Sequence, residues 1–164
     1  MNLQSAADIA LGLIIVGVLA FRQLTWRYVD PARIWRLPVI LGIIGLVELA
    51  GTHMAVGPAD IGFFALEAIV GIAVGLGMGF LTTYRIAPQP DQRGRSVQAR
   101  TGGWGAALWI VLIATRVGID VLAGMNGAHL AASGGSILLV LAINRAARAF
   151  VMDQRLPRER RIRA

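Results

Sequence analysis

The sequence predicts an all-α, multi-pass membrane protein with five transmembrane helices. Of its 164 residues, 56% are hydrophobic and only 15% are charged, which lies outside the range of soluble domains of this length. Apolar stretches long enough to cross a bilayer, about 20 residues each, occur at five places: residues 7–24, 37–56, 60–82, 104–124 and 127–151. The chain therefore divides into a five-helix transmembrane domain, residues 1–151, and a basic tail, residues 152–164.

Arginines predict the orientation of these spans. The chain has 16 basic residues, all of them arginine, and all except Arg116 fall between the first two spans, between the third and fourth spans, or near the C-terminus. Cytoplasmic loops of membrane proteins carry the excess of positive charge. Five spans place all three groups on that side if the N-terminus is outside and the C-terminus is cytoplasmic.

Features of the neighbouring sequence support the prediction of each of the first three spans. Residues 7–24 contain Asp8 and follow no basic residue, unlike the start of a cleaved signal peptide, so we expect a retained helix. Only a few residues around Pro58 join the second and third spans, which are therefore expected to be antiparallel neighbours. The third span carries Gly71, Gly75 and Gly79 at intervals of four. Small residues at this spacing let helix backbones approach closely, either in self-association or in packing within the chain.

The segment between the third and fourth spans, residues 84–103, is polar and rich in Pro, Gly and Arg. Such a composition interrupts helices and favours turns. It fits either a flexible connection or a short hairpin.

Ionisable residues inside the spans are the candidate binding site. Arg116 and Asp120 lie four residues apart on one helix face, where they can pair. Glu48 and Glu67 add two carboxylates at a similar depth, so three carboxylates face one arginine. Charges within a membrane normally face the protein interior, and an uncompensated carboxylate attracts a proton or a cation. We predict an outward-facing pocket that binds a proton, a metal ion or a cationic group. The alternative is a set of structural hydrogen bonds between helices.

The last span adds a polar stripe and a second candidate site. His129, Ser133, Ser136 and Asn144 follow helical periodicity along residues 127–151. His53 ends the second span and His129 begins the fifth, so both are placed near the outer surface. Two histidines at one depth are candidate axial ligands of haem, or ligands of a metal ion.

The motif search predicts no catalytic residues. There is no HExxH, GxSxG or Walker motif and no cysteine nucleophile, which argues against an enzyme. The predicted function is a binding, assembly or transport accessory. The alternatives are a haem-binding redox protein and a proton-coupled transporter that acts as an oligomer.

The expected partners follow from the same features. They are the bilayer itself, anionic lipids near the basic loops and tail, and another membrane protein or a second copy of the chain. Nucleic acid is not expected, because the aromatic residues are placed as membrane-interface anchors and not as a stacking platform.

Four motifs between residues 37 and 121 occur in a recognisable order. They are ALEAIVGIAVG at residues 65–75, TTYR at 82–85, the Arg93-Gly94 pair, and LWIVLIATRVGID at 108–120. In this order the segment resembles the CcdC-like family of small bacterial integral membrane proteins, whose name refers to cytochrome c biogenesis. The resemblance implies a bacterial plasma membrane protein in which Glu67 and Arg116 occupy the shared positions. The family's loop is more strand-like than the proline-rich APQPDQ of this chain suggests.

Overall fold

The computed structural model describes residues 17–18, 21, 23–30, 33–52, 56–130 and 133–156. Over these ranges the chain is mostly helical, with four helices and three short strands. The predicted first span, residues 7–24, lies mostly outside the described residues, as do His53 and residues 157–164 of the predicted tail.

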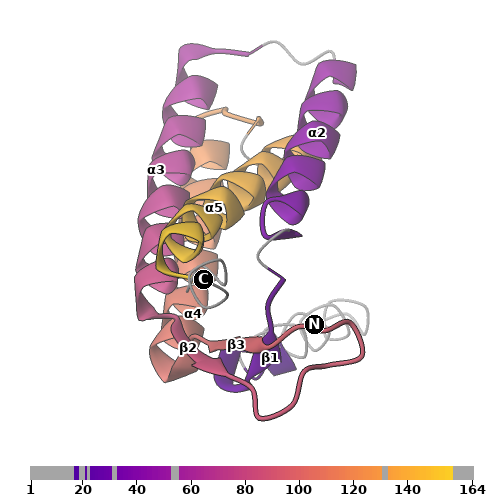
Figure 1. Cartoon of the computed structure of the whole chain (residues 1–164). Coiled ribbons are helices and arrows are strands. Elements are labelled where there is room, and N and C mark those ends of the chain that lie inside the picture. Colours follow the sequence, from indigo (N-terminus) through magenta and orange to yellow (C-terminus); the bar gives the residue numbers. More distant parts are fainter. Residues whose placement is uncertain are drawn as a thin grey trace, which may run out of the picture.

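Three of the helices are long and apolar enough to cross a membrane. The helices are α2 (Arg36–Gly51), α3 (Pro58–Leu81), α4 (Gly102–Met125) and α5 (Gly134–Arg155) (Figure 1). The last three have 24, 24 and 22 residues, hence lengths of about 33–36 Å. Helix α2 has 16 residues and measures about 24 Å, less than the roughly 30 Å of a bilayer's hydrocarbon core. Of the five predicted spans, three correspond to membrane-length helices within the described ranges.

The predicted fifth span begins too early in the sequence. Residues 127–151 were expected to be one helix, but α5 begins at Gly134. Gly127 has a φ of 71°, a left-handed conformation that glycine adopts without steric cost. It follows the end of α4, so the chain turns there, and His129 lies in the connection before α5.

A small antiparallel sheet covers one end of the helices. Strands β1 (Arg27–Tyr28), β2 (Thr83–Ile86) and β3 (Val97–Arg100) are arranged in the order β1-β3-β2, and Figure 1 shows them together below the helices. Residues 84–103 therefore contain a hairpin, the second of the two predicted alternatives. The segment before α2 contributes the third strand, with Tyr28 opposite Gln98.

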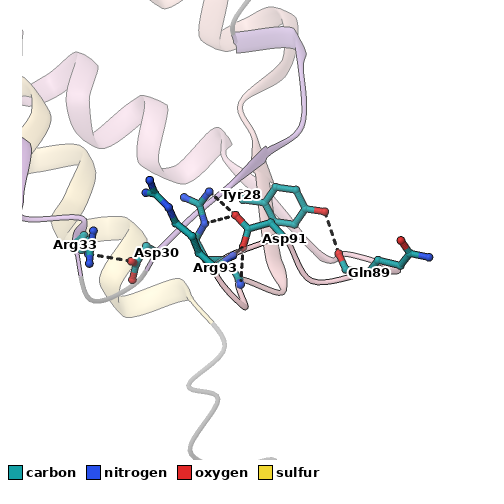
Figure 2. A network of polar contacts seen from close by, with 7 residues as sticks. Tyr28, Asp30, Arg33, Gln89, Asp91 and Arg93 are labelled. Atoms are coloured by element: carbon teal, nitrogen blue, oxygen red, sulfur yellow. Dashed lines mark hydrogen bonds and ion pairs between the residues drawn. The ribbon is translucent and has the colours of Figure 1, made fainter.

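The hairpin turn is held by one aspartate. Asp91 Oδ1 accepts hydrogen bonds from the backbone N–H groups of Arg93 at 3.0 Å and Arg95 at 2.9 Å. Its Oδ2 pairs with the Arg95 guanidinium at 2.5 Å. These donors lower the pKa of the Asp91 carboxyl to about 2, with the Arg95 side chain as the largest cause. Figure 2 shows this turn beside Tyr28, whose hydroxyl donates to the Gln89 carbonyl at 3.0 Å.

Helix α5 packs against both α2 and α3, and α4 packs against α3. The glycine face of α3 is directed at α5: a Cβ atom on Gly79 would lie 2.6 Å from Val151 Cβ, and one on Gly75 would collide with the Asn144 carbonyl oxygen. On the other side, Gly45 of α2 meets Gly135 of α5. Of the two roles predicted for the α3 glycines, the structure shows packing within the chain.

Candidate functional site

Helices α3, α4 and α5 bring three polar residues of the candidate site to one level of the bundle. Glu67 is the tenth of the 24 residues of α3, and Arg116 is the tenth residue counted back from the end of α4. The two helices are joined through the hairpin at the sheet end, so both residues lie about 15 Å from the opposite end. Asn144 of α5 is fully buried and donates a hydrogen bond from Nδ2 to the Gly71 carbonyl at 2.9 Å.

Glu67 is the centre of the polar cluster. It is 2% exposed, and its Oε2 accepts a hydrogen bond from Arg116 Nη1 at 2.8 Å. Arg116 Nε also lies 3.7 Å from Asp120 Oδ2. The pair of Arg116 and Asp120 expected from their spacing is therefore present, but the shorter contact joins α4 to α3. Arg116 links the two carboxylates.

Two oxygens of this cluster are buried and have no hydrogen-bond partner among the described residues. They are Glu67 Oε1 and Asp120 Oδ1. Buried polar atoms are normally paired, because an unpaired one loses its bond to water without replacement. With two carboxylates and one arginine, the cluster has room for one further positive charge or donor.

The cluster borders a cavity of about 290 Å³ between the three helices. The apolar lining residues of this cavity, here called the Glu67 cavity, are Val70, Trp109, Leu112, Ile113, Ile119, Ile137, Val140 and Leu141. The polar lining residues are Glu67, Arg116 and Asn144. Small-molecule sites share this pattern of mostly apolar walls with a few converging polar groups.

Glu48 was predicted to join this cluster, and the structure corrects that expectation. Glu48 is exposed on α2 and lies against Gly134 at the start of α5. It does not line the Glu67 cavity. The physical reason is that α2 packs on α5 through Gly45 and Gly135, whereas the Glu67 cavity is enclosed by α3, α4 and α5.

The predicted polar stripe is shorter than expected. Ser136 and Asn144 are buried on α5. Ser133 is the residue before the helix, where its hydroxyl oxygen accepts a hydrogen bond from the Ser136 backbone N–H at 3.3 Å. His129 is exposed in the preceding connection and is not part of the helix. The stripe therefore serves helix capping and the α3–α5 contact.

The haem and metal candidates are only partly covered by the structure. His53 lies outside the described residues, so its distance to His129 is not defined. Within the described ranges, no three His, Cys, Asp or Glu side chains gather as metal ligands would.

Sequence reasoning missed Trp109 and Asp60. Trp109 lines the Glu67 cavity, and its Nε1 is buried without a hydrogen-bond partner among the described residues. It precedes Arg116 by seven residues, or two helical turns. Helical periodicity could therefore have predicted that Trp109 and Arg116 lie on the same face of α4. Asp60 Oδ1 accepts from the Leu130 backbone N–H at 2.8 Å and ties the start of α3 to the α4–α5 connection. No spacing in the sequence indicates that contact.

These features define a helical protein compatible with insertion in a membrane, with a polar cluster buried among its long helices. No family model, curated protein or solved structure matches the chain. The resemblance to the CcdC-like family therefore stays a prediction based on the four motifs.

Proposed function

We propose that this chain is an integral membrane protein that binds a small, mainly apolar molecule carrying a cationic amine. The binding site is the Glu67 cavity. One observation carries the proposal: Glu67 is almost fully buried at the wall of an apolar cavity, and one of its two oxygens has no hydrogen-bond partner among the described residues.

The charge balance favours a cationic ligand. Glu67 and Asp120 share Arg116, which leaves the cluster one positive charge short. An ammonium group supplies that charge and up to three hydrogen-bond donors. Against apolar walls the ion pair is stronger than in solution, so the amine adds affinity and fixes the orientation of the ligand.

The cavity walls favour an aromatic or aliphatic body for the ligand. Side chains such as Leu112, Ile119 and Val140 form most of the lining, and apolar contact of this kind contributes roughly 25 cal/mol per Å² of buried surface. A dry cavity of about 150 Å³ can hold a benzene molecule. The cavity in this protein, at about 290 Å³, accommodates a ring with a short aminoalkyl chain.

The proposed setting is the bacterial plasma membrane, with five spans, the N-terminus outside and the C-terminus in the cytoplasm. The positions of the arginines support this orientation. Arg27 and Arg85 lie in the sheet, and Arg155 at the end of α5 donates to the Gly79 carbonyl at 3.2 Å, at the same end of the bundle. The positive-inside rule assigns that end to the cytoplasm.

Titration calorimetry on the full chain in mild detergent tests the binding function. The probes are 2-phenylethylamine, which is cationic at pH 7, and 2-phenylethanol, a neutral molecule of the same size. We expect the wild type to bind the amine at least about tenfold more tightly, a difference of about 1.4 kcal/mol. Glu67→Gln is expected to remove this preference, because the neutral amide keeps the shape but not the charge.

Glu48→Gln is the matched control, since Glu48 is an exposed carboxylate outside the cavity. It is expected to bind both probes as the wild type does. Equal affinity for both probes in the wild type, or no saturable binding of the amine, would contradict the proposed function.

A further inference from the structure

A second and larger cavity, about 570 Å³, lies between the sheet, the start of α2 and the C-terminal half of α5. Its lining includes five arginines from four separate segments: Arg27, Arg33, Arg100, Arg145 and Arg148. This cavity, here called the arginine cavity, shares no lining residue with the Glu67 cavity.

Arginines outnumber carboxylates among the described lining residues of the arginine cavity. Among its described lining residues there is one carboxylate, Asp30, and it pairs with Arg33 at 3.3 Å (Figure 2). Arg100 lies with its guanidinium 5.2 Å from the centre of the Trp26 ring, a contact that orients the side chain without neutralising it. Several like charges held this close repel one another unless an anion lies between them.

Arg148 is anchored to a buried threonine. Its Nη2 donates to Thr101 Oγ1 at 2.7 Å, and Thr101 is itself buried. The Nε of Arg148 is buried without a hydrogen-bond partner in the described chain, and no described carboxylate forms an ion pair with it. A half-buried guanidinium that pairs with no described carboxylate favours the binding of an anion.

We propose that the arginine cavity binds a phosphate group. Guanidinium groups present paired N–H donors that match phosphate oxygens, and a phosphate carries enough charge to serve several arginines at once. The cavity also has apolar walls, formed in part by Leu37, Pro38 and Met152. It is therefore suited to a phosphate attached to an organic body, and it lies at the helix ends, where lipid head groups are found. This site is independent of the cationic ligand proposed above.

The test is titration of the full-length protein in mild detergent with three probes. Dioctanoyl phosphatidic acid supplies a lipid phosphate, dioctanoylglycerol supplies the same chains without phosphate, and inorganic phosphate supplies the anion alone. We expect saturable binding of phosphatidic acid and none of dioctanoylglycerol. If inorganic phosphate does not compete, the source is a lipid head group; if it competes, the phosphate group alone suffices and a soluble phosphate compound is the source.

Arg148→Gln is expected to lower the affinity for phosphatidic acid about tenfold, as expected for the loss of one charge-assisted hydrogen bond. Because Arg148 also contacts Thr101, its substitution can disturb the fold, and a second variant, Arg27→Gln, changes an exposed arginine of the cavity. It is expected to lower the affinity for phosphatidic acid about threefold to fivefold. Arg93→Gln removes the same charge from the hairpin turn, outside the cavity. The proposal is overturned if dioctanoylglycerol binds as well as phosphatidic acid, or if Arg93→Gln weakens binding as much as Arg27→Gln does.

Discussion

The Glu67 cavity and the arginine cavity are neighbours that differ in the balance of arginines and carboxylates around them. Arg145 lines the arginine cavity and lies 5.5 Å from the ring centre of Trp109, which lines the Glu67 cavity. In the Glu67 cavity, Arg116 lies between two carboxylates of the protein. In the arginine cavity, one carboxylate accompanies five arginines among the described lining residues.

Position along the helices explains the difference. A charge among helices in a hydrocarbon layer has little access to water, so the protein must supply the opposite charge itself. A charge at the helix ends lies near water, salt and lipid head groups, which can provide the counter-ion. In the first region the protein therefore supplies part of the opposite charge itself, one arginine for two carboxylates, whereas the second region can leave compensation to a ligand.

The largest effect is expected where the compensating charge is removed. Arg116→Met leaves Glu67 and Asp120 without their shared cation, and breaking one partner of a buried ion pair typically costs about 3–5 kcal/mol. Unfolding of the detergent-solubilised protein by denaturant measures this loss. Arg93→Met, which removes an exposed arginine of the hairpin turn, serves as the control. A loss below about 1 kcal/mol for Arg116→Met, the value typical of surface pairs, would show that the cluster is not compensated internally.

The next effect concerns the α3–α5 contact, which lies beside the Glu67 cavity. Gly75→Ala places a Cβ where the Asn144 backbone lies, so the helices must separate, at a cost of about 1–3 kcal/mol. Gly62→Ala is the control on the same helix, because a Cβ there has nothing within 4 Å. The same denaturant titration compares them. Equal stability of the two variants would mean that α3 and α5 are not closely packed.

A smaller effect is expected for Arg27→Gln in phosphate-free buffer. Arg27 is exposed, and no described carboxylate pairs with it. Removing it relieves repulsion and breaks no side-chain hydrogen bond or ion pair with the described residues, so stability should change by less than about 0.5 kcal/mol. A marked destabilisation in the absence of phosphate would indicate that the arginine cavity is structurally compensated, like the Glu67 cavity.

The smallest effect is local to the hairpin turn, where Arg95 is compensated by Asp91. The Asp91 pKa is lowered to about 2 in the folded chain, against about 4 when unperturbed. Its contribution to the turn is therefore complete above about pH 4 and is lost as the pH falls through about 2. Hydrogen exchange at the Arg93 and Arg95 amides, corrected for intrinsic rates, should show lower protection at pH 2 than at pH 5. Asp91→Asn, which does not ionise, should remove this dependence.

Some features of the molecule follow from local sequence alone. Hydrophobic runs predict the long helices because their length is fixed by the bilayer and their composition by its lack of water. The pair of Arg116 and Asp120 follows from a spacing of four, since one helix places both on the same face. The spacing of Gly71, Gly75 and Gly79 likewise identifies a close-packing face, although not the helix that meets it.

The tertiary structure decided the remaining features, since periodicity says which residues share a face and not which faces meet. Helix α2 packs against α5 through Gly45 and Gly135, and this contact keeps Glu48 out of the cluster. Packing of α3 on α4 gives Arg116 its closer partner, Glu67. The arginine cavity combines residues that are far apart in the sequence. Its arginines extend from Arg27 to Arg148 and come together only because β1 pairs with β3 beside the end of α5.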